Sequence, residues 1–254
     1  RVLFRSDHMI VGLKYSFIFN NQNNRNQRHF NYLRVDLESS GNALYSINEI
    51  AGTHKSDSGY YRIFGVRYSQ YFRINIDFRY YFYFKNKTNS LVWRLLLGAG
   101  VPYGNSDELP YEKGFYAGGA NDMRGWIFKS LGPGDYSGNS PYEKIGDIQI
   151  EGNLEYRFPI YSFFKGALFT DIGNIWTYER STTFPGGQFY FNKFYKQLAV
   201  DAGVGFRFDF QILIFRIDVA VPLKNPAYPA GDRWRIRYIQ PKDFVWNFGI
   251  GYPF

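Results

Sequence analysis

Strict alternation between apolar and polar residues over long segments constrains the fold of this chain more than any other feature. In residues 71–84 the even positions from Phe72 to Phe82 are apolar or aromatic, whereas the odd positions include Arg73 and Asp77. Successive side chains of a β-strand point to opposite faces, so this spacing predicts a strand with one apolar and one charged face.

The same alternation recurs along most of the chain and predicts nine strands. Their expected ranges are 9–20, 30–40, 71–84, 91–102, 147–158, 163–176, 197–209, 211–222 and 243–254. Strands of soluble proteins usually have about five or six residues, whereas about ten residues cross a hydrocarbon core when tilted. Many of these segments also end in Tyr, Phe or Trp, as aromatic belts at a membrane interface require. The fold class predicted is all-β, an antiparallel transmembrane β-barrel. A soluble β-sandwich is the alternative, because alternation alone does not separate the two.

Composition narrows the functional classes further. Aromatic residues make up 21% of the chain, and no run of 18 apolar residues is present, which excludes a helical membrane protein. The net charge of +8 raises the question of nucleic-acid binding. Arginines such as Arg73 and Arg157 interleave with acids such as Asp77 and Glu155 on the same predicted faces. A charged barrel interior therefore explains the charge better, and no nucleic-acid partner is expected.

The predicted connections alternate between short turns and long loops, which is typical of outer-membrane barrels. Short connections lie at about 20–28, 84–89, 158–161 and 209–211, and long ones at about 41–66, 103–144, 177–196 and 223–242. This predicts that the short turns face the periplasm and the long loops the exterior.

The loop at about 103–144 carries the most distinctive motif. It contains the run Gly-Gly-Ala-Asn-Asp-Met-Arg-Gly-Trp from position 118 to 126. A connection this long inside a compact protein is usually functional, and its glycines permit tight backbone turns. The candidate site residues in this loop are Gly118, Gly119, Met123, Arg124, Gly125 and Trp126.

This motif resembles the arginine-glycine-aromatic loop of the BamA/TamA outer-membrane barrel superfamily, the surface-antigen-type C-terminal barrel. The resemblance implies that the loop folds back into the barrel lumen. It further implies that Arg124 meets acids on the two following strands, here Glu155 and Asp171. Met123 is a departure, because Val or Ile is more usual before the arginine.

The end of the chain is similar to the signal by which the assembly machinery recognises outer-membrane barrels. The residues that carry this pattern are Asn247, Gly249, Tyr252 and Phe254. An ordinary last strand with an aromatic anchor is the alternative. Alternation predicts that the aromatic and apolar side chains at even positions from Phe244 to Phe254 face lipid. The glycines and Pro253 predict a weakly paired seam, or otherwise relief of crowding where the barrel closes.

Four predicted strands precede the motif and five follow it, whereas the barrels of the resembled superfamily have sixteen strands. The chain also starts with Arg1 and shows no signal peptide or periplasmic polypeptide-transport-associated domain. We therefore expect residues 1–254 to form the C-terminal portion of a sixteen-strand barrel, with periplasmic domains outside this chain.

The resemblance implies a factor for outer-membrane protein insertion, assembly or translocation, located in the outer membrane of a Gram-negative bacterium. It would act non-covalently through a barrel seam and the arginine loop. Its expected partners are outer-membrane lipids, unfolded outer-membrane or secreted client proteins, and accessory lipoproteins or periplasmic factors. A two-partner-type secretion pore and a passive porin or solute channel are the alternatives.

Catalytic chemistry is not expected. The chain has no cysteine, and its three histidines, His8, His29 and His54, lack metal-ligand spacing. Neither a Gly-x-Ser-x-Gly elbow nor a phosphate-binding loop occurs in the sequence. We therefore predict no enzyme activity, no metal and no cofactor.

Overall fold

The computed structural model describes residues 8–23, 27–85, 88–138, 143–210 and 212–254. Its main feature is one antiparallel sheet of nine strands in the order β12-β11-β10-β9-β8-β7-β6-β3-β2. The strands are β2 (Gly12–Asn20), β3 (His29–Ser40), β6 (Tyr71–Tyr83), β7 (Ser90–Pro102), β8 (Ile148–Tyr161), β9 (Phe164–Trp176), β10 (Ala199–Asp209), β11 (Ile214–Lys224) and β12 (Val245–Ile250).

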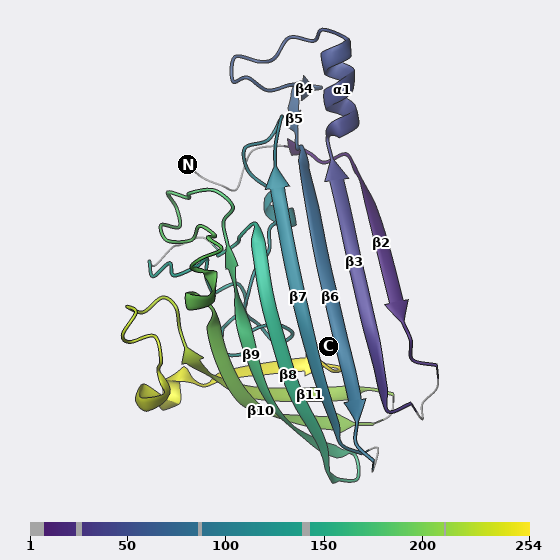
Figure 1. Ribbon diagram of the computed structural model, residues 1–254, viewed down its shortest axis with the longest axis vertical. Helices are drawn as coiled ribbons and strands as arrows, with labels where there is room; N and C mark the ends of the chain where they lie inside the picture. The colour runs from purple at the N-terminus through teal and green to yellow at the C-terminus, as the bar shows by residue number, and fades with distance from the viewer. Residues whose placement is uncertain (1–7, 24–26, 86–87, 139–142, 211) are drawn as a thin grey trace.

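The sheet is strongly curved and open. In Figure 1 the last strands, β10 to β12, run across the direction of β2 to β7, so the sheet curls like part of a barrel wall. Over the described residues its two edges, β2 and β12, are not paired with each other. The predicted antiparallel barrel architecture is confirmed as a partial barrel.

The connection predicted as a loop at 41–66 contains regular structure instead. It holds the helix α1 (Asn42–Ile50) and two short strands, β4 (Arg62–Ile63) and β5 (Val66–Tyr68), which form a small sheet with β1 (His8–Met9). In Figure 1 this region projects beyond the end of β3 and β6. No helix among the described residues is long and apolar enough to cross a membrane.

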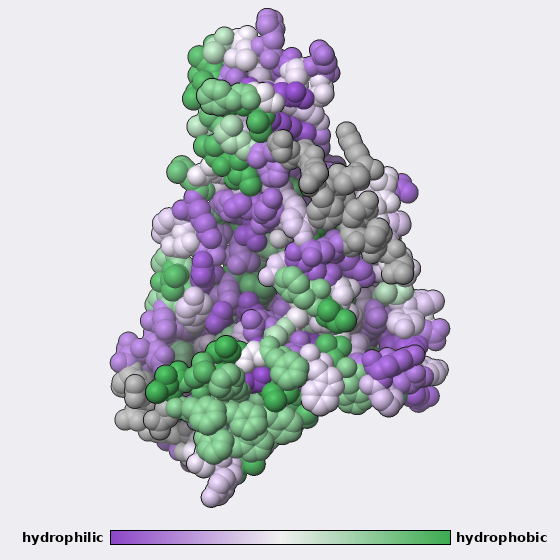
Figure 2. Space-filling model, turned by 180° about the vertical axis from the view of Figure 1, so that it is seen from behind, coloured by the Kyte–Doolittle hydropathy of each residue, from purple (hydrophilic) through white to green (hydrophobic). Residues whose placement is uncertain are grey.

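Side chains on the two faces of the sheet differ as the alternation predicts. On β10, Asp201 and Arg207 are buried, whereas Val204 and Phe206 on the other face are exposed. Figure 2, which views the molecule from behind, shows a polar central region above a hydrophobic area where the last strands lie. The charged face is therefore the inner face of the curved sheet.

In the connection between β7 and β8, the described residues 103–138 and 143–147 fold against this inner face. The inward side chains of β6 and β11 both donate to the backbone of this connection, since Arg73 Nε lies 2.9 Å from Lys113 O and Arg216 Nη2 lies 3.0 Å from Ala120 O. The segment also contains the short 3-10 helix η1 (Tyr111–Lys113). Three more such turns, η2 (Phe194–Lys196), η3 (Ile236–Tyr238) and η4 (Pro241–Asp243), lie in the later loops.

The prediction of a strand over residues 243–254 is wrong at both ends. The strand β12 begins only after η4 and ends at Ile250, because Gly251 adopts a positive φ of 82° and redirects the chain. Phe254 is buried, and its carbonyl accepts a hydrogen bond of 3.1 Å from Arg157. The Arg157 guanidinium also lies 4.2 Å from the centre of the Tyr252 ring. Tyr252 and Phe254 therefore face the interior rather than lipid, since an inward arginine holds them there.

Candidate functional site in the barrel interior

Arg124 is the centre of a buried charge network between the long loop and the inner face of the sheet. Its side chain is fully buried, and Nε and Nη2 each lie 2.9 Å from one oxygen of Asp171 on β9. Its Nη1 lies 2.5 Å from Oε2 of Glu155 on β8. Two parallel N–H···O bonds to one carboxylate match the fork of the guanidinium, which makes the contact directional as well as strong.

Glu155 is shared among three arginines from different elements. Besides the bond from Arg124, Glu155 accepts a 2.8 Å bond from Arg157 on β8. Arg207 on β10 also donates to both Glu155 oxygens, at 3.2 Å each. Arg207 in turn donates a 2.5 Å bond to Asp218 on β11. The charge on Glu155 is therefore compensated from three sides.

Asp171 depends more heavily on the loop. Besides the guanidinium and the main-chain N–H of Arg124, the side-chain amide of Asn153 donates to Asp171, at 3.0 Å. The face of Arg124 lies over the ring of Phe169, two residues earlier on β9, with 3.4 Å between the guanidinium carbon and the ring centre. This cation–π contact covers the part of the arginine that the carboxylates leave open.

Backbone groups of the motif are held as firmly as its side chain. The Gly125 N–H donates a 2.9 Å bond to Asp201 on β10, and the Asn247 amide on β12 donates one of 2.9 Å to the Arg124 carbonyl. A Cβ at Gly125 would come 2.5 Å from the Asp201 Cβ, so this position requires glycine for close approach. With the side-chain bonds of Arg124 to Glu155 and Asp171, the motif therefore contacts strands β8, β9, β10 and β12.

Two further arginines hold the preceding residues of the loop. Arg216 on β11 donates to the Ala120 carbonyl at 3.0 Å and to the Asn121 side chain at 2.6 Å. Arg94 on β7 donates to the Asn121 carbonyl at 3.1 Å. The tip of the loop is thus connected to strands on both sides of Glu155 and Asp171.

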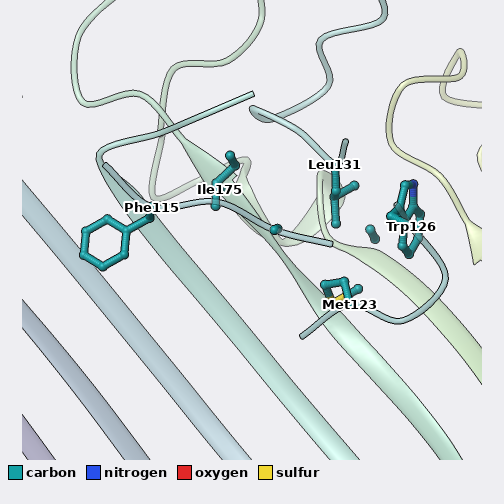
Figure 3. Packing of buried hydrophobic residues seen from close by; sticks show 7 residues of the cluster. Phe115, Met123, Trp126, Leu131 and Ile175 are labelled. Carbon is teal, nitrogen blue, oxygen red and sulfur yellow. The ribbon is translucent and has the colours of Figure 1, made fainter. Parts of the chain in front are cut away.

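An apolar cluster supports the loop on the side toward the long-loop end of the barrel. Met123, Trp126 and Leu131 of the loop are buried with Ile175 of β9 and with Phe115, Ala117 and Ala199. Figure 3 shows Met123, Trp126 and Leu131 on one side of the cluster and Phe115 on the other, with Ile175 between them. Apolar burial and the charge network therefore fix the same short segment.

Electrostatics favour the ionised form of the loop arginine. Burial lowers the pKa of Arg124, but the charges and hydrogen bonds of Asp171 and Glu155 outweigh this, so its pKa lies above the ordinary value. Burial raises the pKa of the neighbouring Asp122 in the same loop. In the described part of the chain no group of three or more histidine and carboxylate side chains suits a metal ion. The arrangement is suited to holding a loop in place.

The structure thus brings Arg124 together with both acids named from the sequence, Glu155 and Asp171. The residues from Gly118 to Trp126 form one tight segment, in which the Gly119 N–H donates to the Trp126 carbonyl at 2.9 Å. At the C-terminal pattern, Asn247 contacts the loop, and a Cβ at Gly249 would meet the Arg216 guanidinium at 2.6 Å.

Several members of the network were not singled out from the sequence as contacts of the loop. They are Arg157, Asp201, Arg207, Arg216 and Asp218. All lie at inward positions of their strands, so the alternation was the signal that placed them on the correct face. Which of them meet across the interior depends on strand register and on the path of the loop.

A family model matches almost the whole chain. The Omp85 superfamily domain matches residues 4–254 of the chain. Among solved structures, the chain is similar to the crystal structure of BamA from Haemophilus ducreyi lacking POTRA domains 1–3, with 14% sequence identity and a TM-score of 0.49. The similarity covers 94% of this chain and 53% of that chain, so this chain spans about half the length of the crystallised chain.

Proposed function

Because the chain belongs to the Omp85 superfamily, we propose that it forms part of an outer-membrane barrel that inserts or translocates other proteins without covalent chemistry. The observation that carries this proposal is the fully buried Arg124, which links an inward-folded loop to acids on two adjacent strands. A loop held in the lumen by a few directional contacts is a device that can be released and restored.

The outer face of the sheet supports a location in the outer membrane. Exposed apolar side chains such as Leu168, Val204 and Phe215 project from successive strands, while their charged neighbours point inward. In lipid such a sheet keeps its backbone hydrogen bonds between strands and its charges in the interior. We propose an outer membrane of a Gram-negative bacterium as the location, with its lipids as one partner.

The edge at β12 supports an interaction with unfolded client proteins. This strand has six residues in register with β11, from Val245 opposite Ala220 to Ile250 opposite Phe215. The strand ends at Ile250, where Gly251 takes a positive φ of 82°, and Pro253 beyond it has no N–H to donate to a ladder. A short strand of this kind makes a weak seam, and a strand of another chain can add to such a seam by β-augmentation. We propose that clients, with accessory lipoproteins or periplasmic factors, use a seam at this edge.

Two other transport functions use the same architecture. A two-partner-type secretion pore would pass a dedicated polypeptide through the lumen, and a passive channel would keep the lumen open to solutes. The loop contacts inward side chains from β6 to β12, so the segment around Arg124 lies inside the curve of the sheet. A loop in this position argues against a passive channel, because it fills space that solutes would need.

The test is reconstitution of the protein into phosphatidylcholine vesicles, followed by addition of an unfolded outer-membrane barrel protein. Folding of the client is measured by its heat-modifiable electrophoretic mobility, and its location by protease protection. We expect client folding to be faster than in protein-free vesicles, and slower with Arg124→Ala than with the unmodified protein. The matched control is Arg180→Ala, because Arg180 is an exposed loop arginine.

Contrary outcomes separate the alternatives. A client that reaches the vesicle lumen instead of the bilayer would favour the secretion pore. Folding no faster than in protein-free vesicles, together with a steady conductance in planar bilayers, would favour the passive channel and contradict the proposal.

A further inference from the structure

Two adjacent short turns of the barrel wall are apolar, although turns usually carry polar residues. Residues 158–164, around the β8–β9 turn, read Phe-Pro-Ile-Tyr-Ser-Phe-Phe, and residues 210–215, around the β10–β11 turn, read Phe-Gln-Ile-Leu-Ile-Phe. Neither segment contains a charged residue. The two turns lie side by side, since the Asp209 N–H donates a 2.8 Å bond to the Phe163 carbonyl.

The apolar side chains of both turns are exposed. Tyr161 is 78% exposed and Ile212 is 98% exposed, and Ile160, Phe163 and Phe210 are each about half exposed. An exposed cluster of this kind on a folded protein marks a surface that another apolar phase covers.

The turns continue the outer face of the sheet. The ring of Phe163 stacks on Phe210 with 5.3 Å between centroids, and Phe210 contacts Phe215 at 6.3 Å. Just above them, Phe164 stacks on Phe206 at 5.7 Å. The aromatic side chains of the two turns are therefore continuous with the outward aromatic side chains of the neighbouring strands.

Charges near these turns point the other way. Lys165 and Asp209, next to the turns on β9 and β10, form an ion pair of 2.5 Å at inward positions. The other two short connections have a different composition, since residues 20–28 read Asn-Asn-Gln-Asn-Asn-Arg-Asn-Gln-Arg and residues 85–89 read Lys-Asn-Lys-Thr-Asn. The short turns thus differ along this end of the sheet. Those that join β2 to β3 and β6 to β7 are polar, and those that join β8 to β9 and β10 to β11 are apolar.

We infer that the β8–β9 and β10–β11 turns insert into the lipid leaflet on the short-turn side and anchor this half of the wall in the bilayer. The inference rests on the proposed function, because it requires the outer face of the sheet to lie in a membrane. The lipid surface is the partner that fits, since the turn surface is continuous with the outer face and carries no charge for a polar protein interface. Apolar side chains inserted at the boundary between head groups and acyl chains stabilise such an anchor.

Site-directed spin labelling tests this directly, because the chain has no native cysteine. Single variants Tyr161→Cys and Ile212→Cys carry a nitroxide in the protein reconstituted into phosphatidylcholine vesicles. Collision with oxygen, which concentrates in the bilayer, is compared with collision with a water-soluble nickel chelate. Val204→Cys on the outer face of β10 is the lipid control, and Gln22→Cys in the exposed polar β2–β3 turn is the water control.

The expected result is an oxygen-to-nickel collision ratio at Tyr161 and Ile212 close to that at Val204 and well above that at Gln22. Ratios at the two turns that equal the Gln22 ratio, with Val204 still in lipid, would overturn the inference and leave the proposed function standing. Protection of both turn labels from oxygen and nickel alike would indicate a covering protein and would also overturn it. A water-like ratio at Val204 would instead refute the membrane location on which the proposed function depends.

Discussion

Replacement of Arg124 by alanine is the most direct perturbation of the candidate site. The side chain is fully buried and makes three short bonds to two carboxylates. The loss falls unequally on them, because Glu155 keeps the charged donors Arg157 and Arg207, whereas Asp171 keeps neutral donors, the Asn153 amide and the main-chain N–H of residue 124.

Removal of one partner from a buried ion pair costs about 3–5 kcal/mol, since the remaining charge is left uncompensated. We expect a loss of this size in the free energy that holds the loop in place. At about 1.4 kcal/mol per factor of ten, this corresponds to a population of the released loop that rises by roughly a hundredfold to a few thousandfold. The double variant Arg124→Ala/Asp171→Asn removes the uncompensated charge and should recover part of the loss. Adding Glu155→Gln instead should not, because it leaves Arg157 and Arg207 without their shared acid.

Amide hydrogen exchange reports the release, because local opening governs exchange of hydrogen-bonded amides. The N–H groups of Gly119, Gly125 and Trp126 are the reporters, since each donates a hydrogen bond in the docked loop. Exchange in the β10 ladder serves as the internal control for overall unfolding. The reasoning is refuted if the alanine variant changes loop exchange by less than about tenfold, or if the Asp171→Asn addition recovers nothing.

Three other substitutions have expected outcomes. Gly125→Ala places a Cβ 2.5 Å from that of Asp201, so it should increase exchange of the loop amides without altering the strands. Ile76→Arg places a charge on the outer face of β6 and should lower the free energy of unfolding in vesicles by about 2–4 kcal/mol, measured by denaturant titration. Burial raises the pKa of Asp147, just before β8, from 3.8 to about 6. The folded state therefore binds this proton more tightly than the unfolded state, and the stabilisation is complete below pH 3.8 and lost as pH rises through about 6. Asp147→Asn should remove this part of the pH dependence of the melting temperature.

Each of these expectations has a contrary result. Unchanged loop exchange in Gly125→Ala would mean that β10 yields to the added methyl group. An Ile76→Arg variant as stable as Ile76→Val, its matched control, would place that face in water. A melting profile of Asp147→Asn parallel to that of the unmodified protein between pH 4 and 7 would show that Asp147 titrates alike in both states.

Much of the fold follows from short-range information. Alternation identified all nine strands of the main sheet, because the two faces of a barrel wall meet different environments and each residue reports its own face. It did not identify the helix Asn42–Ile50 and the short strands β4 and β5 within a connection assigned as a loop. These elements are held by distant groups, such as Asn105, whose amide donates 2.9 Å to the Tyr68 carbonyl and whose oxygen accepts the Tyr61 N–H at 2.7 Å.

The candidate site, like the fold, could be predicted only in part from the sequence. The pairing of Arg124 with Glu155 and Asp171 was available only through the resemblance of the motif, since no local rule joins a loop to two later strands. The roles of Arg207 and Asp201 as contacts depend on how β10 lies beside β9 and on how deeply the loop enters. The inward path of Tyr252 and Phe254 was missed because alternation assumes a continuous strand, whereas the positive φ of Gly251 interrupts it.

The turn at Gly251 has a mechanical consequence for the last strand. Beyond the ladder with β11, the end of the chain is fastened across the interior, where the Phe254 carbonyl accepts from Arg157 on β8 and the two aromatic rings lie near the same guanidinium. Its opposite end, at Val245, follows the exposed turn η4 and has no such crosswise fastening among the described contacts. If β12 separates from β11, it should therefore peel from the long-loop end first, with the short-turn end acting as the pivot.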